Sequence, residues 1–166
     1  MDKDTFYNRV MVLSDKLYRM AKSILLDEED AKDSVQDLYL KLWENKQTLM
    51  EVENMSSYTM KILRNLCLDK LRKKRETELE MCDYVSMQDN TSLYKNIEQK
   101  NMIKVIKQYI NQLPELQRTI VRLRDVEGYE IKEIAYITAS TENAVSANLS
   151  RARQKIRNYL EQDFNI

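Results

Sequence analysis

Apolar residues recur at steps of three and four along most of the chain, the spacing that places them on one face of an α-helix. In the N-terminal part this pattern predicts three helices, at about residues 4–26, 27–45 and 56–75. The first has the most regular stripe: Phe6, Val10, Leu13, Leu17, Met20 and Ile24. The chain contains one glycine and one proline, too few turn residues for a sheet built from tight hairpins. The sequence therefore predicts an all-α fold.

The stretch 113–160 has the pattern of a helix-turn-helix. Pro114 suits the first turn of a helix, and Gly128 suits the end of one. A short apolar helix should follow, then a polar turn at residues 138–140 and a last helix capped by Thr141. One side of that helix carries small, amide and basic groups: Asn143, Ser146, Ala147, Ser150, Arg151, Gln154 and Arg157. Such groups near a helix N-terminus can approach bases and phosphates. The pattern predicts DNA binding; the alternative is an ordinary solvated surface helix.

The outer faces of the second and third predicted helices also suggest partners. The second combines acids with a leucine in its middle: Asp33, Gln36, Asp37, Leu40 and Glu44. An apolar anchor within a polar rim is typical of a binding patch, although an acidic outer face is often only solvated. The third carries a basic stripe: Lys61, Arg64, Asn65, Leu68, Arg72 and Arg75. This charge pattern favours contact with a nucleic-acid backbone, with solvated cations as the alternative.

Composition and charge narrow the class of protein further. Residues 76–92 break the helical period and are acidic, which predicts a flexible linker between two small helical domains, 1–75 and 93–166. Basic and acidic residues balance at 27 each, but they are segregated into blocks. The chain has no histidine, and Cys67 and Cys82 are isolated, which argues against metal sites and disulfides. Without a signal peptide or an apolar run of ~20 residues, we expect a cytoplasmic protein with no membrane insertion, no cofactor and no catalytic site.

Three motifs together resemble those of bacterial sigma factors of the extracytoplasmic-function (ECF) group, within the sigma-70 family. The segment DAKDSVQDLYLKLW at residues 30–43 resembles the family's polymerase-binding helix. The segment YTMKILRNLCLDKLRKKR at residues 58–75 resembles its promoter-melting helix. The segments LPELQRTIVRLRDVEGY at 113–129 and NLSRAR at 148–153 resemble its helix-turn-helix domain. The motifs occur in the family's order and cover nearly the whole chain.

The resemblance implies a two-domain sigma factor that binds core RNA polymerase, directs it to promoters and helps to open the DNA. The polymerase-docking residues that it implies are Asp33, Gln36, Asp37 and Leu40. For the downstream (−10) promoter element it implies a base pocket and strand contacts: Met55, Ser56, Ser57, Lys61, Arg64, Asn65 and Arg72. For the upstream (−35) element it implies Thr141, Asn143, Ser146, Ala147, Ser150, Arg151 and, on a phosphate, Arg153. The implied partners are core RNA polymerase, promoter DNA and an anti-sigma factor.

Some positions depart from the family pattern. Ala139 stands in the helix-turn-helix turn where glycine is frequent, and Tyr58 stands where tryptophan is frequent. Ser146 and Ala147 replace a frequent basic residue, so the preferred upstream sequence does not transfer from relatives. Two other functions remain as alternatives. One is a free-standing helix-turn-helix regulator that never enters the polymerase, and the other is a helical adaptor that binds no DNA.

Overall fold

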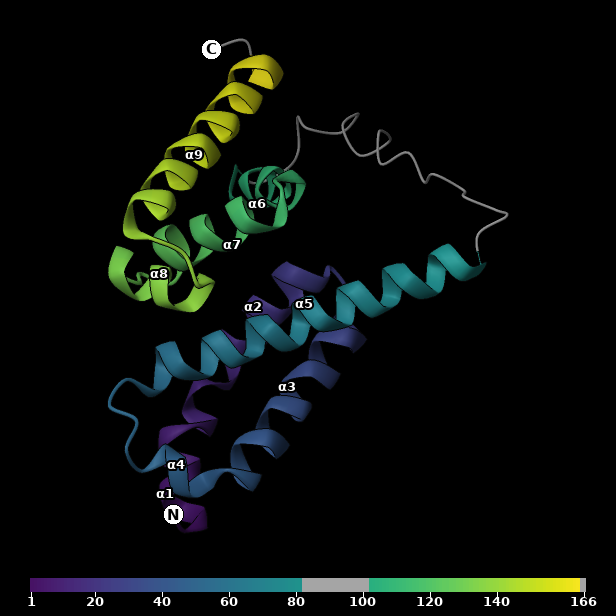
Figure 1. Cartoon of the computed structure of the whole chain (residues 1–166). Coiled ribbons are helices and arrows are strands. Elements are labelled where there is room, and N and C mark those ends of the chain that lie inside the picture. The colour runs from purple at the N-terminus through teal and green to yellow at the C-terminus, as the bar shows by residue number, and fades with distance from the viewer. Residues whose placement is uncertain (82–101, 165–166) are drawn as a thin grey trace.

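The computed structural model describes residues 1–81 and 102–164, and all regular structure in them is helical. The all-α prediction is confirmed, and Figure 1 shows the helices in two groups. The N-terminal group contains α1 (Lys3–Arg9), the 3-10 turn η1 (Met11–Leu13), α2 (Ser14–Leu25), α3 (Glu28–Glu44), α4 (Lys46–Leu49) and α5 (Met55–Met81). The C-terminal group contains α6 (Met102–Gln112), α7 (Glu115–Val121), the π-turn η4 (Arg122–Val126), α8 (Ile131–Thr138) and α9 (Glu142–Phe164).

The N-terminal domain is built on α2, α3 and α5, which pack against one another. Their apolar stripes form its core, and the largest fully buried side chains there are Leu17, Met20, Ile24, Leu38, Leu42, Leu49, Met60 and Leu63. Complete burial of one such side chain contributes ~1.5–3 kcal/mol. Acidic N-caps start α1 and α3, because Asp2 and Asp27 each accept a backbone N–H at 2.8 Å. The hydrophobic pattern thus determines which helix faces meet.

Two predicted boundaries in this domain differ from the structure. The expected helix 4–26 is broken after Arg9 by the turn η1. A step of three from Val10 to Leu13 fits an α-helix and a 3-10 turn equally, so the pattern could not reveal the break. In addition, α5 continues to Met81, six residues into the predicted linker. The Glu, Leu and Met residues there are good helix formers. The rest of the predicted linker, with Cys82, lies outside the described residues.

The C-terminal domain has the predicted helix-turn-helix, with α8 and α9 as its two helices. Pro114 directly precedes α7, and Gly128 follows η4 with a φ of +78°, the left-handed conformation that favours glycine. Ala139 ends α8 with a φ of +50°, which is unusual for a residue with a Cβ. The Thr141 hydroxyl accepts the Ala144 N–H at 3.1 Å, so its prediction as the N-cap of α9 is confirmed.

The two domains are folded onto each other. Helix α7 packs against α2, and α8 packs against the N-terminal half of α5. Their buried apolar side chains form one continuous cluster. None of the helices in residues 1–81 and 102–164 is both long and apolar enough to cross a membrane. This closed arrangement decides which of the predicted functional residues are accessible.

Candidate nucleic-acid interface

The predicted docking residues lie together on the solvent-exposed side of α3. Asp33, Gln36, Asp37 and Leu40 are all exposed, and Leu40 has 63% of its surface accessible. Their spacing of three and four places them on one helical face, while the opposite face, with Leu38 and Leu42, is buried in the core. A leucine held in water among carboxylates gains nothing for folding, which makes this face suitable for a partner.

The residues predicted to contact the downstream element have very different exposures. Met55 and Ser57 are buried, and Met55 belongs to the hydrophobic core. Arg64 is only 8% exposed. Ser56 and Lys61 are half-buried, whereas Asn65 and Arg72 are exposed farther along α5, where Arg72 pairs with Asp69 of the same helix at 2.9 Å. In the closed arrangement, therefore, only the distal part of the basic stripe is open to a nucleic acid, and Met55 contributes to packing.

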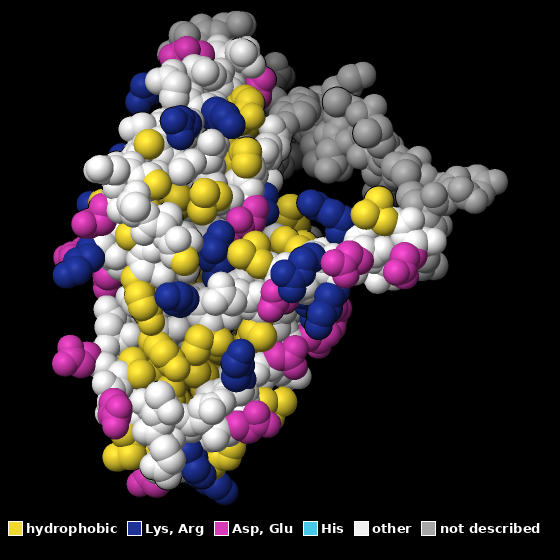
Figure 2. Space-filling model, viewed as in Figure 1, with side chains coloured by type: hydrophobic (Ala, Val, Ile, Leu, Met, Phe, Trp, Pro, Cys, Tyr) yellow, Lys and Arg dark blue, Asp and Glu magenta, His cyan; other side chains and the backbone are white. Residues whose placement is uncertain are grey.

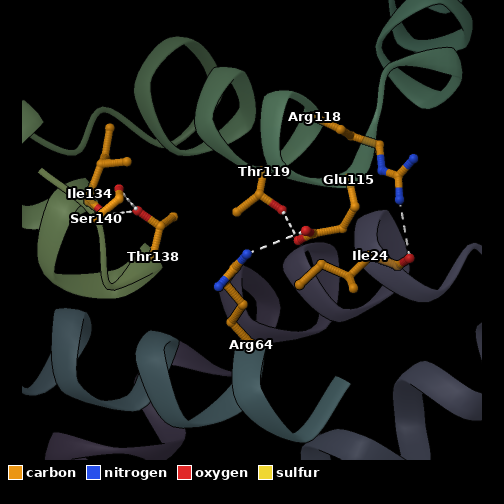
Figure 3. A network of polar contacts seen from close by, with 8 residues as sticks. All are labelled: Ile24, Arg64, Glu115, Arg118, Thr119, Ile134, Thr138 and Ser140. Carbon is orange, nitrogen blue, oxygen red and sulfur yellow. Dashed lines mark hydrogen bonds and ion pairs between the residues drawn. The ribbon is translucent and has the colours of Figure 1, made fainter. Parts of the chain in front are cut away.

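An ion pair between the domains buries Arg64 (Figure 3). Its Nη2 lies 3.2 Å from Oε2 of Glu115, in the first turn of α7. Glu115 Oε1 also accepts a hydrogen bond from Thr119 Oγ1 at 2.9 Å, which fixes the carboxylate toward α5. Close by, Arg118 Nη2 donates to the Ile24 carbonyl at 3.2 Å, joining α7 to the end of α2. Burial lowers the pKa of the Arg118 guanidinium.

A second network joins the start of α5 to α8 through the Glu133 carboxylate. Oε1 of Glu133 accepts from Asn54 Nδ2 at 2.9 Å and from Ser57 Oγ at 3.5 Å. Oε2 accepts the Glu130 N–H at 2.8 Å, completing the capping box of α8. These hydrogen bonds, first that from Glu130, lower the pKa of the Glu133 carboxyl. The Glu133 carboxylate therefore accepts hydrogen bonds at the N-terminal ends of α8 and of α5, which belong to different domains.

Aromatic side chains cover the remaining polar groups at the start of α5. The hydroxyls of Ser56 and Tyr129 are 2.5 Å apart, and burial raises the pKa of the Tyr129 hydroxyl. Lys61 Nζ lies 4.3 Å from the centroid of the Tyr136 ring, within the range of a cation–π contact. In Figure 2, Lys and Arg side chains gather along α5 and around the junction of the domains, with carboxylates among them. The covering surface is thus acidic and aromatic.

The interface contains polar groups that are buried without full compensation. The Nε atoms of Arg64, Arg118 and Arg122 have no hydrogen-bond acceptor among the described residues. Each buried, unpaired donor costs about 1–3 kcal/mol. A more exposed bond, between Arg19 and Glu127, is bidentate at 2.9 and 3.0 Å, but an ion pair near the surface adds only about 0–1 kcal/mol. The polar contacts therefore add little net stability to the closed arrangement, and the apolar cluster shared by the two domains contributes more of it.

The predicted recognition helix is accessible in the same arrangement. Exposed side chains on its polar side include Thr141, Asn143, Ser146, Ser150, Arg151 and Arg153, with Ala147 half-buried. Arg153 is held by Asp125, with Nη2–Oδ1 at 2.6 Å and Nε–Oδ2 at 3.1 Å, and this bond raises the pKa of the guanidinium. The Thr141 hydroxyl is engaged in capping. Arg151 is thus better placed than Arg153 to reach a base.

Sequence reasoning missed the side chains that cover α5, namely Glu115, Tyr129, Glu133 and Tyr136. An acid in the first turn of a helix predicts only a favourable contact with the helix dipole, so neither glutamate suggested a partner in the other domain. Cys67 is fully buried in the core, and burial raises its thiol pKa to about 12. Within residues 1–81 and 102–164, no three potential ligands gather in a metal-type cluster.

Two helical domains, one of them a helix-turn-helix with an exposed recognition helix, define a class of DNA-binding transcription proteins. Comparison with known families agrees with this class. Residues 10–77 match the model described as Sigma-70 region 2, and residues 103–156 match Sigma-70, region 4. The chain is 30% identical over 148 residues to the RNA polymerase sigma factor SigV of Bacillus subtilis, covering 88% of this chain and 85% of that one. It is 28% identical to the ECF sigma factor SigM of Mycobacterium tuberculosis, covering 91% and 76%.

The chain therefore belongs to the sigma-70 family of RNA polymerase sigma factors, in its ECF group. Both alternative functions are disfavoured, because a regulator or an adaptor would leave the region 2 match unexplained. Its fold resembles that of the sigma factor RpoE solved with the anti-sigma factor NepR from Bartonella quintana. The TM-score is 0.77 at 23% identity, over 95% of this chain and 97% of that one. The fold also resembles CnrH, solved with the cytosolic domain of CnrY, with a TM-score of 0.68.

Proposed function

We propose that the chain binds core RNA polymerase through the exposed face of α3 and acts in the cytoplasm as a non-catalytic initiation factor. The observation that carries this proposal is the position of Asp33, Gln36, Asp37 and Leu40 on one exposed helical face, at whose edge Asp33 lies 4.0 Å from Lys70 Nζ of α5. An apolar centre with a charged rim has the composition of a protein-binding patch. It lies within the region 2 match.

The upstream promoter element is assigned to the exposed side of α9. Small side chains at Ser146 and Ala147 allow the helix to lie deep in a major groove, and Arg151 can donate to a guanine edge. Arg153, aligned by Asp125, is assigned to a phosphate. The Ser150 hydroxyl between the two arginines can contact either kind of group.

The downstream element is assigned to the loop before α5 and to the basic stripe along that helix. Opening a duplex requires a site for an extruded base and cations along the displaced strand. Ser56, Ser57, Lys61 and Arg64 can serve only after the C-terminal domain has moved away, because α7, α8 and Tyr129 just before α8 contact them. Binding to the polymerase is proposed to supply that opening. Since one similar solved structure is a complex with an anti-sigma factor, we also propose an anti-sigma factor for this chain.

Transcription with purified core polymerase tests the proposal directly. Genomic fragments should yield discrete run-off transcripts only when the chain is added, and the absence of any discrete product would contradict the proposal. The double substitution Lys61→Ala with Arg72→Ala should reduce transcription from linear templates and permanganate reactivity at the start site. Transcription by this double variant should recover on a template with a pre-melted bubble, because the strands are already separated.

Lys104→Ala, which removes an exposed charge from α6, is the matched control and should behave like the wild type on both templates. Equal loss on linear and pre-melted templates would contradict a melting role for Lys61 and Arg72.

A further inference from the structure

The loop between α4 and α5 is held by a side chain from the start of the protein. Arg9, the last residue of α1, donates from Nη1 to the Leu49 carbonyl at 2.9 Å and from Nη2 to the Val52 carbonyl at 2.5 Å. Its partners are 40 and 43 residues later in the chain. Arg9 is half-buried, which shields these two bonds from competition by water.

The planar guanidinium fixes the shape of this loop as well as its position. Its two donors lie in one plane at a constant separation, so the two carbonyls are held relative to each other. The Leu49 carbonyl also accepts the Val52 N–H at 3.3 Å, which closes a turn. Two residues later Asn54 caps α5 by accepting the Ser57 N–H at 3.0 Å. Only Glu53 separates these anchors, so the loop is fixed at both of its ends.

The side chains of this loop divide into anchors and exposed groups. Leu49 is fully buried, and Val52 is half-buried against the core. Met50, Glu51 and Glu53 are exposed. The loop thus presents its outward groups in one defined conformation, while the side chains of Leu49 and Val52 are packed and their carbonyls are hydrogen-bonded. This is more than connection of two helices requires, since a short polar loop can join them without a tertiary clamp.

We propose that Arg9 is a positioning residue that sets the sequence specificity of the downstream promoter contact. The proposal rests on the proposed function, which assigns this loop and the start of α5 to that element. A base is discriminated by groups placed to within a fraction of an ångström, and a loop that moves loses this discrimination before it loses affinity. Arg9 touches no DNA itself; it acts by keeping residues 50–54 in the reading conformation.

Two substitutions separate positioning from simple stabilisation of the fold. Arg9→Met keeps the length of the side chain and removes both donors. Arg9→Lys keeps the charge, but a single ammonium cannot hold two carbonyls at a fixed separation. The control is Lys3→Met, which removes an exposed charge from the same helix. Arg9→Lys carries the test if Arg9→Met does not fold.

The specificity is measured on the holoenzyme assembled from core RNA polymerase and each variant. The probe is a fork-junction DNA library whose single strand is randomised over the downstream element and sequenced before and after binding. The wild type should enrich its preferred base about tenfold at the discriminating position. Both Arg9 variants should lower this enrichment to about threefold or less, and Lys3→Met should not. Hydrogen exchange of the amides of residues 50–53 should accelerate only in the Arg9 variants.

An unchanged enrichment profile in both Arg9 variants would overturn the proposal, even if their melting temperatures fall, because a stabilising residue alone leaves specificity intact. A wild-type chain that binds core polymerase but selects no sequence would overturn the downstream assignment and the role of Arg9 with it. A wild-type chain that fails to bind core polymerase would overturn the proposed function itself. The core-binding step therefore distinguishes the two failures.

Discussion

The same folded chain presents its two candidate promoter surfaces in opposite ways. The polar side of α9 is open to solvent, and its arginines lie at the surface, with Arg153 aligned by Asp125 and Arg157 donating to Gln154 of the same helix. The start of α5 is covered by the other domain, and Arg64 is buried against Glu115. Both surfaces carry cations and hydroxyls. The two surfaces therefore differ in the groups of the same chain that contact them.

The groups that cover α5 explain this difference. Two carboxylates and two aromatic rings occupy its cations and hydroxyls. A single DNA strand offers the same two chemistries as phosphates and bases. A basic surface that binds such a strand also binds acidic and aromatic side chains, whereas the one ion pair of α9 among the described residues is that of Arg153 with Asp125. On the proposed assignment, the surface at the start of α5 must be uncovered before it can bind a DNA strand, whereas the polar side of α9 is already open.

The largest expected effect comes from removing the acid that holds Arg64. Glu115→Ala leaves a buried guanidinium without its carboxylate, which should disfavour closure by about 2–3 kcal/mol after allowance for the partial exposure of the pair. Glu115→Gln keeps an acceptor for Thr119 and should have a smaller effect. Affinity of the free chain for a random single-stranded oligonucleotide should rise about tenfold or more in Glu115→Ala.

Energy transfer between dyes at exposed positions 44 and 162 reports the closure directly, with Cys82 replaced by serine. Glu161→Gln, an exposed acid at the end of α9, is the control and should change neither signal. If Glu115→Ala opened the domains without improving strand binding, the covered surface of α5 would not be a nucleic-acid surface.

The docking face of α3 provides a third surface that is exposed in the closed chain. Asp37→Arg and Leu40→Ala should each weaken binding to core polymerase by about 1–3 kcal/mol, because they remove a charge or an apolar anchor from the patch. Asp37→Arg should also slow association, whereas Glu115→Gln should not, since first contact needs no opening. Surface plasmon resonance with immobilised core polymerase measures both quantities. Glu161→Arg controls for charge reversal, and wild-type kinetics in Asp37→Arg would refute this docking site.

Substitution of Arg151 and substitution of Arg153, both on the polar side of α9, should have different effects on DNA binding. Arg151→Ala should relax preference at one upstream base by about 1–3 kcal/mol, the discrimination of a bidentate base contact. Arg153→Ala should weaken cognate and scrambled sites alike and lower the salt dependence, as expected for a phosphate contact. Titrations of holoenzyme on both sites at two salt concentrations separate these effects. Identical specificity ratios for the two variants would mean that neither arginine reads a base.

The sequence predicted the elements well because their evidence is local. Core stripes such as that of α2, the cap Thr141 and the glycine at position 128 depend on neighbours within two turns. The exposed face of α3 was also visible, since a leucine among acids breaks the ordinary pattern. The same local rules misplaced the end of α5, where acidic residues suggested a linker although they favour a helix.

The covering of α5 could not be predicted in the same way. The partners in it, Arg64 with Glu115 and Ser57 with Glu133, are 51 and 76 residues apart, and charge alone does not select one acid among many. Arg9 is a similar case. It donates to main-chain carbonyls, which every residue type has, so the sequence does not reveal which residues accept its hydrogen bonds. The tertiary contacts that decide accessibility are thus the part that side-chain patterns along one sequence do not encode.

The smallest predicted effect concerns the turn that delivers α9 to solvent. Ala139 has a φ of +50°, and its N–H donates to the Tyr136 carbonyl at 3.3 Å while Ser140 N–H donates to Ala135 at 3.0 Å. A Cβ in this conformation costs about 1–2 kcal/mol, which glycine avoids, although the greater freedom of glycine in the unfolded chain offsets about 0.4–1 kcal/mol of that gain. Ala139→Gly should therefore stabilise the C-terminal domain by about 0.5–1 kcal/mol and raise its Tm by a few degrees.

Ala144→Gly, inside α9, should lower stability by about 1 kcal/mol instead. Thermal unfolding followed by circular dichroism measures both variants, and a lower Tm in Ala139→Gly would show that the turn carries no such strain. Because the turn only positions the recognition helix, the upstream sequence specificity of Ala139→Gly should remain that of the wild type. The polar side of α9 should therefore stay accessible in this variant, in contrast to the covered start of α5.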